Sequence, residues 1–184
     1  MSIAALLVAA RDQLRSKMTV PGGPAQAKNF IGIQPDGRPP RNSGDWYIGI
    51  DESRIESSDI AFLKEQFAID AVISHRADRF PQDHWGEIYL QAINGLDAIE
   101  RQVIQFLHGN QNVRLAANAY LQIVPPDASN GDGFQKPLYY VGRARTAQRH
   151  DEEWTGAAGS ESTWLVRTLA FRGGTRIQSF EIMK

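Results

Sequence analysis

A run of alternating apolar and polar residues at positions 63–75 constrains the fold of this 184-residue chain more than any other feature. Successive side chains of a β-strand point to opposite faces of its sheet, so this alternation predicts a long strand with one buried and one solvent-facing side. Glu65 interrupts the apolar parity near the start, which predicts that this end projects beyond the core. The apolar positions are Leu63, Phe67, Ile69, Ala71 and Ile73, and the polar positions are Lys64, Gln66, Asp70 and Ser74.

Helical spacing of apolar residues occurs in three other segments. Gly95 is expected to bend or divide the long middle helix, and Gly109 with Asn110 to end it. His108, in the last turn, is expected to interact with the terminal carbonyls of that helix. Apolar residues spaced three and four positions apart predict helices at 2–17, 88–107 and 112–121.

Strand-like alternation marks further segments on both sides of the helices. Gly173 and Gly174 predict a hairpin turn between the last two strands. In the segment 136–149, Leu138, Tyr140 and Gly142 are expected on one face and Tyr139, Val141 and Arg143 on the other. The strands are predicted at 29–34, 45–51, 136–149, 164–172 and 175–183.

The order of these elements favours an α+β fold. Helices do not alternate strand by strand with the sheet, so we expect two layers, a mainly antiparallel β-sheet with helices packed on one face. The length fits a single domain spanning residues 1–184. Polar, proline-rich or glycine-containing segments predict loop insertions at about 35–44, 125–135 and 151–162.

Composition excludes several classes of function. With no cysteine, the chain has no disulfide, thiolate catalysis or Cys-based metal site. A net charge of −1 gives no reason to expect nucleic-acid binding, and no apolar run is long enough for a transmembrane helix. The charge is nevertheless segregated, at +3 in residues 1–50, −5 in 51–124 and +1 in the remainder. Such asymmetry would suit head-to-tail contacts between copies, but three segments of a random sequence often differ this much, and chance is the better interpretation.

The polar residues show no convincing catalytic or cofactor motif. Neither the Gly-x-Ser-x-Gly nucleophile elbow nor a phosphate-binding glycine loop occurs. His75 and His84 flank a loop with Asp78 and Asp83, but their spacing matches no metal-binding pattern, and a solvated loop is the better interpretation. We therefore assign no catalytic, cofactor-binding or metal-binding residues and expect no enzyme activity.

The tryptophans divide into two groups. Trp46, Trp85 and Trp164 are expected in the core. Trp154 follows an acidic run inside the predicted loop 151–162, from which it does not readily reach the core. Exposed aromatic side chains are common interface anchors, so we interpret Trp154 as a partner contact, with packing inside its own loop as the alternative.

Taken together, the pattern resembles the tail terminator, or tail completion, proteins of tailed bacteriophages. The resemblance is carried by the N-terminal helix Ile3 to Leu14, the strand LKEQFAIDAVISH at 63–75, the helix GLDAIERQVIQFL at 95–107, and the C-terminal segment WLVRTLAFRGGTRIQSFEI. It covers most of the chain as a pattern of elements. The segments 35–44 and 151–162 are additional to a minimal member of that family.

The resemblance implies a structural virion protein of the phage neck, assembled in the host cytoplasm. It implies a homo-oligomer, a hexameric ring, that caps the tail tube and joins it to the head-tail connector, with the tail sheath as a further candidate partner. Within such a ring we expect Arg143, Arg145 and Arg149 of one subunit to meet Glu52, Glu56 or Asp59 of its neighbour. A growing tube would stop because the far face of the ring no longer presents the tube's binding surface.

Two other classes of function fit the same sequence. One is a different neck or baseplate assembly protein. The other is a small-ligand-binding or hydrolytic α+β domain that uses the face between the sheet and the long helix.

Overall fold

The fold was analysed in a computed structural model of the chain, which describes residues 3–19, 30–40, 44–53, 62–77, 85–110, 113, 138–150 and 163–179. Over 62–67 and 173–179 the description is of the backbone. In chain order the elements are helix α1 (Ile3–Lys17), strand β1 (Ile31–Ile33), the 3-10 turn η1 (Pro35–Gly37), strands β2 (Trp46–Glu52) and β3 (Phe62–Arg76), helix α3 (Trp85–Leu107), and strands β4 (Tyr139–Arg143), β5 (Ala147–His150) and β6 (Thr163–Ser179).

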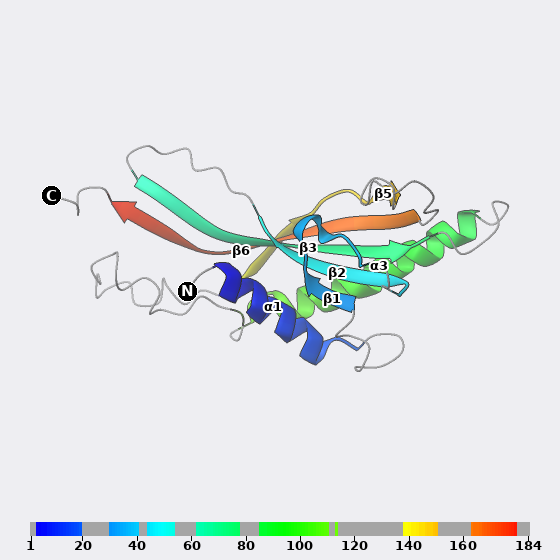
Figure 1. The fold of residues 1–184 in the computed structure, drawn as a ribbon, viewed down its shortest axis with the longest axis horizontal. Coiled ribbons are helices and arrows are strands. Elements are labelled where there is room, and N and C mark those ends of the chain that lie inside the picture. The colour runs from blue at the N-terminus through cyan, green and yellow to red at the C-terminus, as the bar shows by residue number, and fades with distance from the viewer. Residues whose placement is uncertain are drawn as a thin grey trace.

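One mixed sheet contains all six described strands. The order across it is β1-β2-β3-β6-β4, and β5 pairs with β6 further along the same edge as β4. Only the short β1 runs parallel to its neighbour, while the other pairs are antiparallel. The expected α+β architecture with a mainly antiparallel sheet is therefore confirmed (Figure 1).

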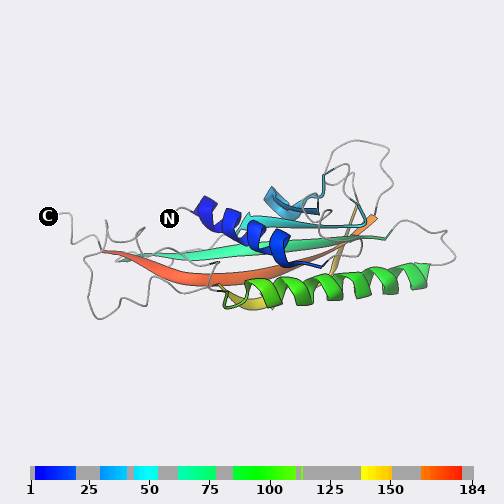
Figure 2. The same ribbon diagram turned by 90° about the horizontal axis from the view of Figure 1, so that it is seen from below.

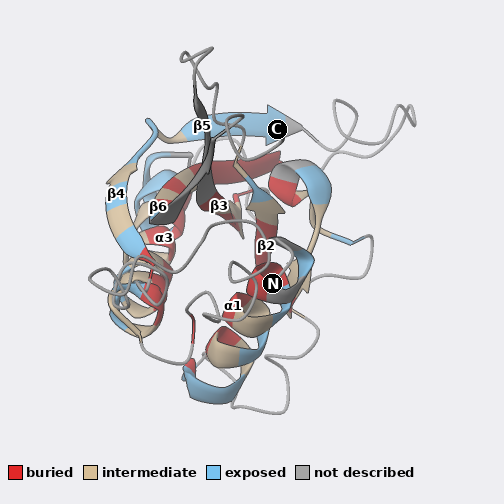
Figure 3. Cartoon of the chain, turned by 90° about the vertical axis from the view of Figure 1, so that its left-hand side faces the viewer, coloured by how far each residue is buried: buried red, intermediate tan, exposed pale blue. Residues whose placement is uncertain are grey.

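Helices α1 and α3 pack against the same face of the sheet, which we call the helix face. Their buried apolar stripes join inward residues of β2, β3 and β6 in one hydrophobic cluster (Figure 3). The register Ile48 to Ile73 and Ala71 to Leu169 places these side chains on that face, in line with the predicted alternation. Two hydrogen bonds between the Gln102 amide and the backbone of Thr19 tie the end of α1 to α3.

Gly95 lies where α3 passes close to the His75 side chain of β3. Helix α3 runs unbroken through it, so the expected division of this helix is wrong. A Cβ at Gly95 would lie 2.4 Å from Cδ2 of His75 on β3. The glycine therefore serves helix–sheet packing. Gly109 ends the helix as predicted, with a φ of 65° that suits the left-handed position after a helix.

Among the described residues, the opposite side of the sheet, which we call the outer face, is covered only in part. Pro35–Gly37, within the predicted insertion 35–44, forms η1 and lies over β2 and β3 there. Gly37 adopts φ 66°, and a Cβ on it would meet the Val72 side chain at 2.1 Å. Trp164 and Val166 are buried beside Val72 in a second, smaller apolar cluster.

Strands β3 and β6 continue past both helices as a two-stranded ribbon (Figures 1 and 2). The ribbon comprises residues 62–66 of β3 paired with 175–179 of β6. The partner strand β2 reaches only Ile69 of β3, and β4 reaches only Arg172 of β6. Within the described residues, both edges of the ribbon therefore lack a neighbouring strand.

The predicted hairpin at Gly173-Gly174 is wrong, because β6 runs straight through it. Between the pairs Gln66 to Thr175 and Ala68 to Arg172, Phe67 of β3 faces two residues of β6, namely the two glycines. This is a β-bulge, a feature that also favours glycine because the extra residue needs an unusual backbone conformation.

A second irregularity changes the predicted faces of β4. The register shifts between Tyr140 and Gly142, so Val141 is the extra residue. Tyr140 lies opposite Phe171 and Arg143 opposite Leu169, which places both on the helix face. The expectation that Arg143 lies opposite to Tyr140 is therefore wrong.

The predicted helix 112–121, apart from the buried Val113, and the predicted insertions 125–135 and 151–162 lie outside the described residues.

Candidate functional site

The residues predicted to form an interface occupy opposite sides of the sheet, as far as they are described. Arg143 ends β4, Arg149 belongs to β5, and Arg145 lies in the connection between these strands, with all three side chains exposed. Glu52, also exposed, ends β2 on the other side of the sheet. Trp154, Glu56 and Asp59 lie outside the described residues. The arrangement places a basic edge and an acidic residue far apart in strand order.

A buried arginine organises the region behind the basic edge. Arg167 of β6 points to the helix face and is only 4% exposed. Its Nη1 lies 2.6 Å from Oδ1 of Asp97 on α3 and also binds Glu100, and its Nε donates to the hydroxyl of Thr146. Burial of a guanidinium is costly unless its donors are satisfied, so these contacts fix α3, β6 and the β4–β5 connection relative to one another.

The electrostatics of this cluster favour a permanently charged arginine. Burial alone would lower the pKa of Arg167, but hydrogen bonds to Asp97 and Glu100 and their negative charges outweigh it and raise that pKa. A guanidinium held in this way does not exchange protons near neutral pH. The Arg167 guanidinium is therefore suited to holding structure and not to acid–base catalysis.

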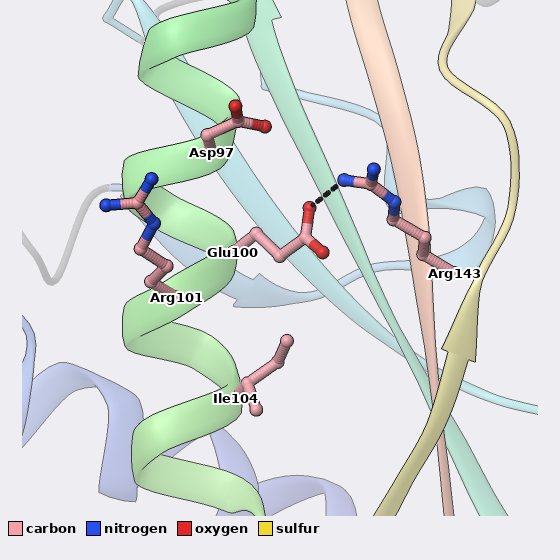
Figure 4. A pocket seen from close by; sticks show the side chains of 5 residues that line it. All are labelled: Asp97, Glu100, Arg101, Ile104 and Arg143. Atoms are coloured by element: carbon pink, nitrogen blue, oxygen red, sulfur yellow. Dashed lines mark hydrogen bonds and ion pairs between the residues drawn. The ribbon is translucent and has the colours of Figure 1, made fainter.

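Arg143 joins this cluster from the solvent side. Its Nη1 lies 2.9 Å from Oε2 of Glu100 (Figure 4). Glu100 is therefore shared between the buried Arg167 and the half-exposed Arg143. An open hollow of about 260 Å³ lies here between α3 and β4. Four of its five lining residues are charged, in the set Asp97, Glu100, Arg101, Ile104 and Arg143. The contact occupies Arg143 within its own chain, while its predicted contact with a neighbouring subunit stays a prediction.

The space between the sheet and α3 is otherwise filled by apolar side chains. Leu96, Val103 and Leu107 of α3 are fully buried against the sheet, and Ile99 is 5% exposed.

A pair of carboxylates faces solvent on the outer face. Asp51 of β2 lies directly opposite Asp70 of β3 in the register. Like charges directly opposite one another destabilise an antiparallel pair. Burial, and to a lesser extent Asp51, raise the pKa of Asp70, whereas the hydrogen bond from Ser53 and the charge of Arg172 act against that rise. Glu52 lies at the same end of β2 but on the other face of the sheet, because it pairs with Ile69 and not with Asp70.

The described histidines have structural contacts. Nδ1 of His75 lies 3.0 Å from the carbonyl oxygen of Arg76. His108 accepts a hydrogen bond from the Tyr140 backbone N–H at 3.1 Å and stacks edge-on against Tyr139. The expected interaction of His108 with the helix carbonyls is replaced by this contact, because the chain returns past the helix end as β4.

His84, Asp78 and Asp83 lie outside the described residues, so the structure does not place the candidate metal ligands together with His75. Among the residues that are described, no group of three or more histidines and acids is arranged to hold a metal ion.

The tryptophans follow the sequence interpretation where their side chains are described. Trp46 and Trp164 are buried, as predicted. Trp164 lies on the outer face, with the Arg76 guanidinium 5.1 Å from the centre of its ring. Trp85 is the first residue of α3.

Sequence reasoning missed the Arg167 cluster and the Asp51–Asp70 pair. One signal for Arg167 was present, because it occupies the same parity as Leu165, Leu169 and Phe171 in a strand whose inward positions are otherwise apolar. The spacing of Asp97 and Glu100 placed them on one helix side, but nothing local connected them to position 167.

Comparison of the sequence with protein-family models finds no match, and comparison with curated proteins finds no significant one. In the part of the chain that is described, no helix has the length and apolar character needed to cross a membrane.

Proposed function

We propose that this protein is a structural component of a phage tail, a tail terminator that forms an oligomeric ring on the tail tube and joins it to the head-tail connector. The proposal starts from the sequence resemblance. One structural observation carries it further, namely the ribbon of β3 and β6 that extends past the helices with both edges lacking a described neighbour.

The ribbon supports assembly because a two-stranded ribbon is marginal in water on its own. Its outward-pointing N–H and C=O groups can be paired by backbone from another chain. A ligand-binding or hydrolytic domain gains nothing obvious from such an extension. A ring around a tube, in contrast, needs each subunit to reach its neighbours and the surface below.

The charged cluster supports the same role from the other side of the molecule. Arg167, Asp97 and Glu100 lock the β4–β5 edge to α3. An edge that is held rigidly loses little conformational entropy on docking, so it suits an assembly surface.

The decisive experiment is a mass measurement by light scattering, on the protein alone and mixed with the tail-tube protein of the same phage. We expect a mass of six chains and a stable complex with tube ends. A monomer that ignores tube protein would overturn the proposal. Tube assembly in the presence of substoichiometric protein should also stop at shorter lengths.

A pair of variants tests the ribbon itself. Adjacent residues of a strand direct their backbone N–H groups to opposite edges, so Ile177→Pro and Gln178→Pro differ in which edge they disrupt. We expect one variant to lose stability because it breaks pairing with β3, and the other to keep its melting temperature but lose assembly. Normal assembly of both folded variants would contradict a role for the ribbon.

A further inference from the structure

The end of helix α3 occupies backbone groups on the edge of β4 that faces away from β6. Gly109, which follows the helix, donates its N–H to the carbonyl oxygen of Leu138 at 2.8 Å. Tyr140 donates its backbone N–H to Nδ1 of His108 at 3.1 Å. Both groups of β4 therefore have their partners at the helix end and not on β6, which lies on the other side of the strand.

These two hydrogen bonds reproduce the ones that a parallel neighbouring strand would make. A residue in such a strand donates to the carbonyl of the residue before the one it faces, and accepts from the N–H of the residue after it. Here the faced residue is Tyr139, whose ring lies edge-on to His108 at 5.6 Å between ring centres. An imidazole nitrogen accepts only when it carries no proton, so the contact holds the His108 ring proton on Nε2.

Helix α1 occupies the edge of β1 in a similar way, on the other side of the sheet. Gln34 donates its N–H to the carbonyl oxygen of Ile50 on β2 at 3.1 Å. Backbone groups alternate in direction along a strand, so those of Ile31, three residues before Gln34, point away from β2. The carbonyl oxygen of Ile31 accepts hydrogen bonds from Nε of Arg15 at 2.8 Å and from Nη2 of the same side chain. Each helix thus supplies a side chain that occupies a backbone group on one edge of the sheet.

The side chains of β4 show why its edge benefits from being closed. Tyr139 is 47% exposed and Val141 is 57% exposed. Aromatic and β-branched residues favour strands. An edge strand that combines exposed apolar side chains with open backbone groups is a template for pairing with another chain. At β4 the end of α3 removes the second of these two conditions.

We propose that His108 with Gly109, and Arg15, close the β4 and β1 edges to strand addition by a second copy of this chain. The inference goes beyond the proposed function, because it follows from hydrogen bonds within one chain. Contacts between copies then form through side chains or at other strands, and the backbone groups of Ile31, Leu138 and Tyr140 take no part in them.

Hydrogen–deuterium exchange of the Tyr140 amide measures closure of the β4 edge directly. His108→Ala removes the acceptor and should speed exchange at Tyr140 by about fivefold or more. His108→Asn should restore slow exchange, because Oδ1 of asparagine is as many bonds from the backbone as Nδ1 of histidine. Gln105→Ala, at an exposed position of the same helix, is the matched control and should leave exchange unchanged.

Opening the edges should also create a new contact between copies. His108→Ala, and to a greater extent its combination with Arg15→Met, should form species larger than those of the original protein, with a share that rises with concentration in sedimentation velocity. Val141→Lys places a charge on the β4 edge, which opposes strand addition. His108→Ala with Val141→Lys should therefore have the mass of Val141→Lys alone. Lys17→Met, which removes an exposed cation from the same helix as Arg15, is the control for that position.

Circular dichroism identifies any variant that does not fold, and if the combined variant fails, His108→Ala alone carries the test. Unchanged exchange at Tyr140 in folded His108→Ala, species of the original size in the opened variants, or larger species that persist with Val141→Lys would each overturn the inference. Equal effects of Gln105→Ala or Lys17→Met would overturn it as well. An original protein that stays monomeric and ignores tube protein contradicts only the proposed function, because exchange reads the edge within one chain.

Discussion

The two faces of the sheet differ in how the fold accommodates their charged side chains. On the helix face, Arg167 is buried with two carboxylates and a hydroxyl that satisfy it inside the chain. On the outer face, Asp51 and Asp70 lie opposite each other with like charge, and burial raises the pKa of Asp70 although Ser53 and Arg172 act against that rise. The first arrangement satisfies a buried guanidinium, whereas in the second burial and a like charge disfavour the ionised form of Asp70. A buried charge that is satisfied in this way stabilises the fold, whereas a carboxylate that is disfavoured in its ionised form lowers the stability of the fold.

Removal of the buried Arg167 cation should have the largest effect on the free energy of unfolding. Arg167→Met leaves Asp97 and Glu100 facing an apolar neighbour, and loss of one partner from a buried ionic cluster costs about 3 kcal/mol. Urea unfolding followed by circular dichroism measures the change. A loss of less than about 1 kcal/mol would mean that the helix face does not depend on this cluster, and the comparison between the faces would fail.

The close approach of α3 to the sheet should have the next largest effect. Gly95→Ala places a methyl group against the His75 ring, and overpacking of this kind costs about 2 kcal/mol. Gly86→Ala in the same helix is the control, because a Cβ there meets nothing within 4 Å. The change in melting temperature, measured by thermal unfolding, should be negative for Gly95→Ala and positive or close to zero for Gly86→Ala. Equal melting temperatures would show that the helix layer can shift away from the sheet freely.

On the outer face, removal of a charge should stabilise the monomer. The folded state raises the pKa of Asp70 above 3.8, mainly through burial, so its ionised form is disfavoured when the chain folds. Asp70→Asn should therefore gain up to about 1 kcal/mol at pH 7 in high salt. In the original protein, the cost of ionising Asp70 in the folded state is absent below pH 3.8 and appears as the pH rises through the pKa of the folded state. The stability gain of Asp70→Asn should therefore vanish at pH 3. A pH-independent difference would exclude this cause.

The smallest effect on the free energy of unfolding is expected for Arg143, at the solvent-exposed side of the Arg167 cluster. Arg143 is half exposed, and exposed ion pairs contribute little, so Arg143→Met should cost about 0.5 kcal/mol. The measurement is the same urea unfolding series, with Arg101→Met as a control on the other side of the hollow. A cost comparable to that of Arg167→Met would show that Arg143 belongs to the core of the network.

Local patterns predicted those parts of the fold that depend on local spacing. The alternation at 63–75 predicted β3 and its buried face, and Gly109 predicted the end of α3. Gly173-Gly174 was misread because a hairpin and a β-bulge both favour glycine. The choice between them depends on whether β3 is long enough to pair beyond the bulge, and that information lies about a hundred residues away.

The charged sites were less predictable for the same reason. Arg167 is 70 residues from Asp97 and 67 from Glu100 in the chain, so no window of sequence contains the cluster. Asp51 and Asp70 meet only through the register of β2 and β3. The sequence shows that both residues are aspartates, but whether they lie opposite each other depends on how β2 and β3 pair, which neither strand specifies alone.

The central position of β6 also determines when the sheet can form. It is the last described strand in the chain, yet it pairs with β3, β4 and β5. A ribosome-bound chain that lacks residues 163–179 would expose the whole inner edge of β3 and leave β4 and β5 with no described strand to join. The backbone edge of β3 therefore stays unpaired, and open to chaperones or to aggregation, until residues 163–179 have been synthesised.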